Sequence, residues 1–139
     1  MAKVLIVNSS PRKNSNSAAL AEQVALGAKD AGHSVSTVNA ATLDIKPCKG
    51  CYACMAPGSK GCVQHDGMYN EAYPLVREAD VIIFASPVYW FNLSGQIKIF
   101  IDRLLAVAGG KDENGKPHFA SKKLGLAMVY GDSDPYNSG

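Results

Sequence analysis

No apolar stretch in this 139-residue sequence is long enough to cross a membrane. The two longest, Val81 to Ala85 and Ile97 to Ile101, are far shorter than the roughly 20 residues that a membrane helix needs. A signal peptide is also missing, because the first residues already form a strand-like pattern. We therefore expect a cytoplasmic protein with no membrane partner.

An excess of charge of one sign is missing as well. The formal net charge is +2, from 14 basic and 12 acidic residues, and no run of like charges forms a tail. Nucleic-acid-binding proteins usually carry a basic patch, and electron carriers that dock onto other proteins usually carry a strongly acidic face. The sequence therefore gives no indication of nucleic acid as a partner and does not show an acidic docking face.

The common nucleotide-binding loops are absent, since the chain has neither G-x-G-x-x-G nor the Gly-Lys-Ser/Thr of a nucleoside-triphosphate loop. A Ser-His-Asp or Cys-His set is not apparent either. The three histidines, His33, His65 and His118, lie at a strand start or in loops and are expected to be solvated. We accordingly assign no catalytic side chain.

Short apolar runs predict the strands of a parallel sheet. Lys3–Asn8 and Asp80–Ser86 are apolar without alternation, which is typical of strands buried on both faces. Two further strands are expected over His33–Asn39, at a sheet edge, and over Leu124–Tyr130. Helical patterns lie between these strands, so the sequence predicts a single α/β domain, residues 1–139, with a doubly wound parallel sheet.

Three helical patterns connect these strands. The first, Ala18–Ala31, repeats Leu20, Val24 and Ala28 and is expected to bury that face. The second starts near Met68, ends before Ala79 and should kink or restart at Pro74. The third is expected to bury apolar residues at helical spacing: Ile97, Phe100, Ile101, Leu104 and Leu105.

A polar loop follows the first strand, at the carboxyl end where ligands bind in such sheets. It supplies hydroxyls, amides and one cation just before a helix N-terminus, from Ser9, Ser10, Arg12, Asn14, Ser15, Asn16 and Ser17. The free N–H groups and the dipole of a helix N-terminus favour an anion, so a phosphate monoester would fit. The alternative is that these residues only cap the helix and form turns.

An aromatic loop follows the second central strand and consists of Pro87, Val88, Tyr89, Trp90, Phe91 and Asn92. Three consecutive aromatic residues are costly to expose unless they cover a ligand or a partner. A planar ring system is the simplest such ligand. The alternative is packing under the next helix or in a subunit interface, and the latter favours a homo-oligomer.

Four cysteines, Cys48, Cys51, Cys54 and Cys62, have the spacing C-x2-C-x2-C-x7-C. Three thiolates separated by two residues each can converge on one [4Fe–4S] cubane, with a more distant cysteine as the fourth ligand. Zinc fits less well, because structural zinc sites tend to use two separated pairs of ligands. The alternative is a loop of reduced or partly disulfide-linked thiols that contacts a neighbouring subunit.

Three segments of the chain carry a family resemblance: VNSSPRKNSNSAALAE, PCKGCYAC with Cys62, and ADVIIFASPVYWFNLSGQIKIFIDR. The chain resembles the NADPH-dependent FMN reductase and iron-sulfur flavoprotein family of flavodoxin-like proteins, and it is similar to multimeric flavodoxins that act as quinone reductases. The resemblance implies that the first loop holds the FMN phosphate and that Pro87 to Asn92 meet the isoalloxazine. It also implies contacts to the ring from Gly131 and Asp132, although Asp132 has the alternative of an exposed turn residue.

By this resemblance, FMN would take electrons from NAD(P)H and pass them to a flavin, a quinone or another small acceptor. The alternatives are an electron carrier between redox proteins and an interaction module without cofactor. Two features depart from the family: Gly67 follows Asp66 where a second acidic residue is usual, and the chain stops at Gly139. This type of sheet calls for a further helix and strand after that point, so the resemblance implies a truncated chain or an edge covered by something else.

Overall fold

Four parallel strands form the main sheet of the computed structural model, which describes residues 1–109, 114–115, 117–134 and 136. Their order is β2 (Ser34–Asn39), β1 (Lys3–Asn8), β3 (Val81–Tyr89) and β5 (Lys123–Val129), and each pair of neighbours is parallel. The predicted parallel, flavodoxin-like sheet is therefore confirmed, with β2 at an edge as expected.

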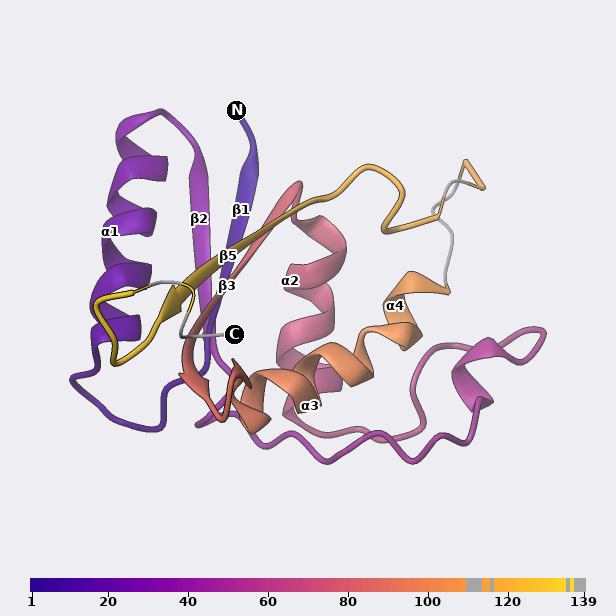
Figure 1. Cartoon of the computed structure of the whole chain (residues 1–139). Coiled ribbons are helices and arrows are strands. Elements are labelled where there is room, and N and C mark those ends of the chain that lie inside the picture. The colour runs from indigo at the N-terminus through magenta and orange to yellow at the C-terminus, as the bar shows by residue number, and fades with distance from the viewer. Residues whose placement is uncertain (110–113, 116, 135, 137–139) are drawn as a thin grey trace.

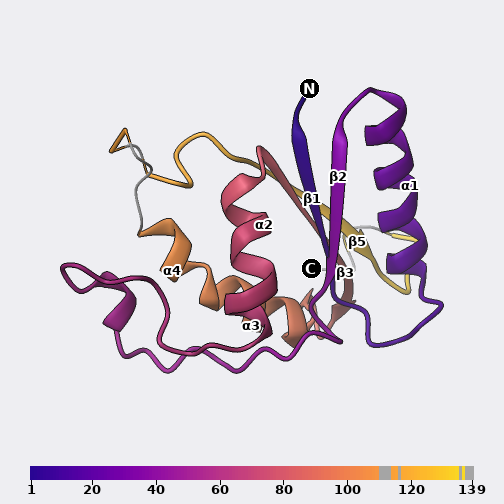
Figure 2. The ribbon, with the colours of Figure 1, turned by 180° about the vertical axis from the view of Figure 1, so that it is seen from behind.

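Helices cover both faces of this sheet. Helix α1 (Asn16–Asp30) lies on one face, whereas α2 (Tyr73–Glu78), α3 (Gly95–Arg103) and the short α4 (Leu105–Ala108) lie on the other (Figures 1 and 2). A π-helical turn, Met68–Ala72, leads into α2, and Pro74 stands in the first turn of α2. The predicted restart of this helix at Pro74 is confirmed, because proline lacks the N–H that would continue the preceding turn.

Strand β1 shows why the apolar residues of the central strands form a continuous run and do not alternate with polar residues. Val4 and Ile6 pack toward α1, and Leu5 and Val7 pack with the core under α2 and α3. All four side chains are almost fully buried. A strand with helices on both sides needs apolar side chains on both faces, which removes the period of two.

The predicted buried face of the first helix is only partly correct, because Val24 and Ala28 are half-buried and pack against the core whereas Leu20 is exposed. Helix α1 buries Ser17, Ala21 and Ala25 against the sheet, while Leu20 is 37% exposed. Small side chains allow the helix to lie close to the strands, and they carry a weaker hydrophobic signal than leucine does. The predicted burial of Leu105 is also wrong, because the chain tightens at Leu104 and turns Leu105 outward.

The aromatic segment is a β-hairpin rather than an open loop. Strand β3 continues to Tyr89, and the short β4 (Asn92–Leu93) pairs with it antiparallel. Trp90 and Phe91 form the turn with φ values of 51° and 61°. Positive φ at both central residues defines a type I′ turn, which normally uses Asn-Gly and is therefore not recognisable from this sequence.

None of the described helices is long and apolar enough to pass through a membrane.

Candidate functional site

A cavity of about 270 Å³ lies at the carboxyl ends of β1, β3 and β5. Three segments far apart in the sequence form its wall: Ser10, Arg12, Asn14, Ser15, Asn16, Ser17, Pro87, Val88, Tyr89, Val129, Tyr130 and Gly131. The structure thus brings the polar loop, the aromatic segment and the end of the last strand to one place. Val129 and Tyr130 were not predicted, since their own apolar run marks them only as strand residues.

The polar end of this cavity is suited to an anion. Ser15 caps α1, and its Oγ accepts a hydrogen bond of 3.1 Å from the N–H of Ala18. Asn16 and Ser17 are the first two residues of α1, and their N–H groups have no acceptor among the described residues. Arg12 adds a cation, and the lining contains no carboxylate. These groups fit a phosphate, for which a helix N-terminus supplies both N–H donors and a favourable dipole.

Ser9 lies behind the cavity rather than in its wall. Its Oγ accepts a 2.8 Å hydrogen bond from the Oγ of Ser94 and donates one of 3.3 Å to the carbonyl of Ala85. The N–H of Ser94 in turn donates to the Oγ of Ser86. All three serines are buried, so they join the end of β1 to β3 and to the start of α3. Sequence reasoning missed Ser86 and Ser94, for which the only signal is a serine beside apolar core positions.

The aromatic hairpin divides into an inner and an outer part. Pro87, Val88 and Tyr89 line the cavity, whereas Trp90, Phe91 and Asn92 do not. Trp90 is 93% exposed and Phe91 is 63% exposed, and their rings contact each other edge to face. The alternative that these two rings pack under the next helix is therefore wrong.

At the end of β5, Gly131 lines the cavity and Asp132 does not. The Oδ1 of Asp132 accepts a 3.0 Å hydrogen bond from the N–H of Asp134, as in a turn. None of the three histidines lines this cavity, and the ring of His65 stacks on Tyr69 at the surface.

The four cysteines lie on the irregular segment between β2 and the π-helical turn, and all are free thiols. Cys48 and Cys51 are exposed, while Cys54 and Cys62 are half-buried and pack against the core. Burial raises the pKa of Cys54, and the charges of the other three cysteines add to this effect. In the described part of the chain, no three His, Cys, Asp or Glu side chains are arranged to hold a metal. The thiols match a cluster in number and type, but they do not form a closed ligand set.

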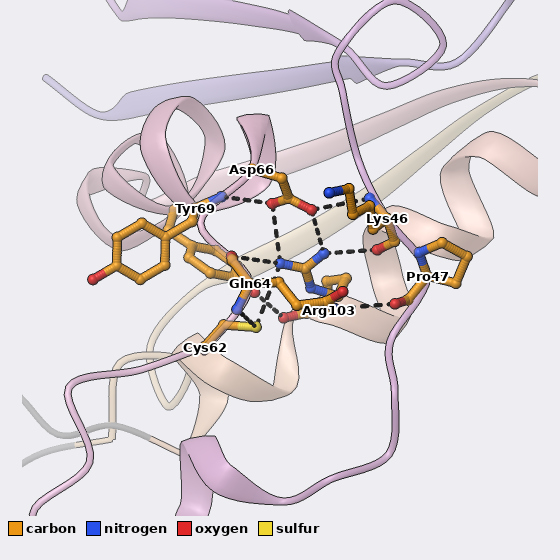
Figure 3. A network of polar contacts seen from close by, with 8 residues as sticks. Lys46, Pro47, Cys62, Gln64, Asp66, Tyr69 and Arg103 are labelled. Carbon is orange, nitrogen blue, oxygen red and sulfur yellow. Dashed lines mark hydrogen bonds and ion pairs between the residues drawn. The ribbon is translucent and has the colours of Figure 1, made fainter.

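One buried guanidinium holds this cysteine segment against α3 (Figure 3). Arg103 forms a two-armed ion pair with Asp66, with distances of 2.8 Å from Nη1 to Oδ2 and 3.1 Å from Nη2 to Oδ1. Nη1 also donates to the carbonyl of Lys46 at 2.7 Å, and Nη2 donates to the carbonyl of Gln64 at 3.3 Å and to the Sγ of Cys62 at 3.4 Å. Arg103 was not predicted as a site residue, because a charged residue on a helix is usually solvated.

The charges of this pair are strongly stabilised. Burial alone would raise the pKa of Asp66, but hydrogen bonds from Arg103 and from the N–H of Lys46 outweigh burial and hold the pKa at about 2. Burial raises the pKa of Tyr73, whose hydroxyl donates to the carbonyl of Arg103, to about 12. The carboxylate and the guanidinium are therefore both charged throughout the physiological range.

Gly67 explains the departure from the usual acidic pair. A Cβ at this position would lie 2.8 Å from the carbonyl oxygen of Asp44 and equally close to the side chain of Leu43. The N–H of Gly67 donates to that same carbonyl at 2.8 Å. The close approach of the two backbones leaves no room for a second acidic side chain beside Asp66.

Comparisons with known proteins show to which family this chain belongs. The family model described as NADPH-dependent FMN reductase matches residues 2–135. A protein of Archaeoglobus fulgidus named iron-sulfur flavoprotein is 39% identical over 128 residues, which cover 92% of this chain and 54% of that protein. A protein of the same name from Methanosarcina thermophila is 34% identical over 132 residues, which cover 94% of this chain and 64% of that protein. The chain thus spans between about half and two thirds of the length of these relatives.

Among solved structures, the fold resembles the NAD(P)H:quinone oxidoreductase from Methanothermobacter marburgensis with a TM-score of 0.73 and 17% sequence identity. The match covers 95% of this chain and 65% of that one. At this identity the likeness concerns the fold alone.

The Asp66–Arg103 pair makes the free energy of unfolding depend on pH in the acidic range. Because the pKa of Asp66 is lowered, its contribution is fully present above a pH of about 4 and is lost as pH falls toward 2. We expect Asp66→Asn to lower the free energy of unfolding by about 3 kcal/mol at pH 7, since it leaves a buried guanidinium unpaired. The difference from wild type should shrink below pH 4 in urea unfolding experiments.

Asp102→Asn is the matched control, because Asp102 pairs with Lys98 at the exposed surface of α3, the helix that carries Arg103. That change should cost less than about 1 kcal/mol at any pH. An Asp66→Asn loss no larger than the control's would contradict the stabilising role of the buried pair.

Proposed function

Because the chain belongs to the family of NADPH-dependent FMN reductases, we propose that it is an FMN-dependent oxidoreductase. FMN would take electrons from NAD(P)H and pass them to a flavin, a quinone or another small acceptor. The single observation that carries this proposal is the cavity in which the polar loop, the inner aromatic hairpin and the end of β5 meet. FMN supplies the redox chemistry when bound, so the chain's own residues need only bind and orient it.

The polar end of the cavity would hold the phosphate. The N–H groups at the start of α1 and the side chains of Ser10, Arg12, Asn14, Ser15, Asn16 and Ser17 are the donors that we assign to it. Ser9 would position this loop through its hydrogen bond with Ser94. The loop supplies hydroxyl, amide and cationic donors for a terminal phosphate and lacks the glycines of a dinucleotide fold, which favours FMN over FAD.

The apolar end of the cavity would face the ring system. Pro87, Val88 and Tyr89 line the cavity from the end of β3, and Tyr130 and Gly131 line it from the end of β5. Trp90, Phe91 and Asn92 lie outside the cavity, so any part they take in covering the ring depends on a rearrangement or on another chain. We propose that the protein is a cytoplasmic homo-oligomer in which this exposed turn is covered.

The phosphate assignment is tested by Arg12→Ala and Asn14→Ala, both at exposed positions of the cavity rim. A hydrogen bond to a charged group contributes about 1.5 to 3 kcal/mol, so each change should weaken FMN binding by about 10- to 100-fold. FMN fluorescence titration measures this. Lys13→Ala, an exposed cation outside the cavity lining, should leave affinity within about threefold, and equal effects of all three variants would refute the assignment.

The enzymatic assignment is tested by stopped-flow mixing of the FMN-loaded protein with NADH or NADPH. We expect one nicotinamide to bleach the flavin absorbance, and a quinone or free flavin to restore it. None of the three histidines lines the cavity, so His→Ala variants should keep their rates. Reduction by a low-potential protein donor, but by neither nicotinamide within minutes, would favour the electron carrier instead.

A second candidate function adds a [4Fe–4S] cluster on Cys48, Cys51, Cys54 and Cys62. Its support is that all four thiols are free and lie on one irregular segment of the chain. The two relatives described above carry the name iron-sulfur flavoprotein. Closing a ligand set would require the irregular segment to draw its exposed cysteines, Cys48 and Cys51, toward the half-buried pair.

Anaerobic reconstitution with iron and sulfide tests this candidate. We expect about four irons per chain and a broad absorption band at the blue edge of the visible range, because a cubane contains four irons. Cys51→Ser should remove both signals. Uptake of fewer than about two irons by the wild-type chain would leave the cysteines a structural or redox-sensing role.

A further inference from the structure

A second cavity, of about 320 Å³, lies beside α4 and shares no lining residue with the cavity at the carboxyl ends of the strands. Helices α4 and α1 lie at opposite sides of the molecule (Figures 1 and 2). Three parts of the chain form most of this second cavity: residues between Cys54 and Gly61, Arg77 of α2, and His118 before β5. The fold therefore builds a separate site from segments that are far apart in the sequence.

The ionisable side chains in this lining, apart from the thiol of Cys54, are all basic. They are Lys60, Arg77 and His118, and no Asp or Glu of the described residues lines the cavity. None of these three side chains has a hydrogen bond or an ion pair with another described residue. A hollow lined by cations alone concentrates anions from solution.

The guanidinium of Arg77 lies close to the turn that forms the other wall. A Cβ built at Gly61 would lie 3.8 Å from the Nη2 of Arg77. The Cζ of Arg77 lies 5.8 Å from the centre of the Tyr73 ring. The absence of a side chain at Gly61 thus leaves space next to a guanidinium that has no acceptor in the described part of the chain.

The turn supplies backbone donors as well. The Oγ of Ser59 donates to the carbonyl of Gly61 at 3.2 Å and accepts from the N–H of Gly61 at 3.2 Å, which closes the turn. The N–H groups of Gly58 and Lys60, which also line the cavity, have no acceptor among the residues that the structure describes. Unpaired backbone N–H groups beside a cation are suited to an oxyanion.

We propose that this cavity binds a phosphate group, either inorganic phosphate or the phosphate monoester of a small molecule. The fork of Arg77 can bind two oxygens, and Lys60, His118 and the free N–H groups supply further donors. The three terminal oxygens of a phosphate monoester can accept all of these bonds, whereas the two oxygens of a carboxylate cannot. A bound phosphate would tie the cysteine segment to α2, and its binding does not depend on FMN.

Amide N–H signals in NMR spectra test this proposal on the FMN-free chain. During titration with sodium phosphate at constant ionic strength, the signals of Gly58, Lys60 and Gly61 should shift and saturate, with half-saturation at about 1 mM. Sodium acetate should give no saturable shift. The signals of Asn16 and Ser17 report on the proposed FMN phosphate site in the same titration, so the two assignments can fail separately.

Arg77→Gln should raise the half-saturation concentration about tenfold, because it removes a charge and the fork. Arg77 is exposed, so the change should leave the fold intact. Lys49→Gln is the matched control, because it removes an exposed cation of the same cysteine segment outside the lining, and it should alter half-saturation by less than about threefold. Shifts that do not saturate in wild type, or equal half-saturation in the two variants, would overturn the proposal.

NADPH and NADH distinguish the two sources of phosphate, since only NADPH carries a phosphate monoester. A saturable shift of the same signals with NADPH but not with NADH would assign the cavity to the monoester of a nucleotide. A response to inorganic phosphate and to neither dinucleotide would assign it to free phosphate. Equal responses to NADH and NADPH would show that the cavity does not select a phosphate monoester and would overturn the proposal.

Discussion

The buried ion pair between Arg103 and Asp66 is the interaction on which the irregular segment between β2 and the π-helical turn depends. Between β2 and the π-helical turn, the chain has only one short 3₁₀ turn, Ala53–Met55, so its own backbone bonds cannot fix its course. Burying two charges is expensive unless their hydrogen-bonding groups are satisfied. Here the Nη groups of the guanidinium reach two carbonyls and a sulfur besides the carboxylate, and the carboxylate also accepts from the N–H groups of Lys46 and Tyr69. The buried Nε–H of Arg103 has no partner among the described residues. The segment is therefore held at its two ends by one side chain of α3.

Helix α3 connects this ion pair to the cavity at the carboxyl ends of the strands. Ser94, just before its first residue, is bonded to Ser9 and Ser86 behind the cavity wall, and Arg103 is its last residue. Nine residues at about 1.5 Å per residue give a length of about 13 Å. One rigid element thus sets the separation between the proposed flavin site and the cysteine segment. A shift of α3 at either end would therefore change the geometry of both the cavity and the cysteine segment.

The strands and the position of the cavity could be predicted because each depends on a local pattern. Continuous apolar runs mark strands buried on both faces, and the loop after the first strand must lie at a carboxyl end of the sheet. The missed features depend on tertiary packing. The buried face of α1 is built from Ala21 and Ala25, which are less hydrophobic than the exposed Leu20, and Arg103 has the sequence context of a solvated helix residue. Its burial follows from partners 37 to 57 positions away in the chain, which no local pattern reports.

The conformation of the aromatic turn depends both on local backbone geometry and on tertiary contacts. A left-handed conformation costs a residue with a side chain about 1–2 kcal/mol, and both Trp90 and Phe91 adopt it. Neither ring gains compensation from burial, since both are exposed. The turn is instead fixed from its base, by the pairing of Val88 with Leu93 and by the bond between Ser94 and Ser86. Ser86 and Ser94, which order the cavity wall, therefore also hold the rings of Trp90 and Phe91 outward. The inner hairpin residues face the cavity, and the two outer rings remain accessible for contact with another chain.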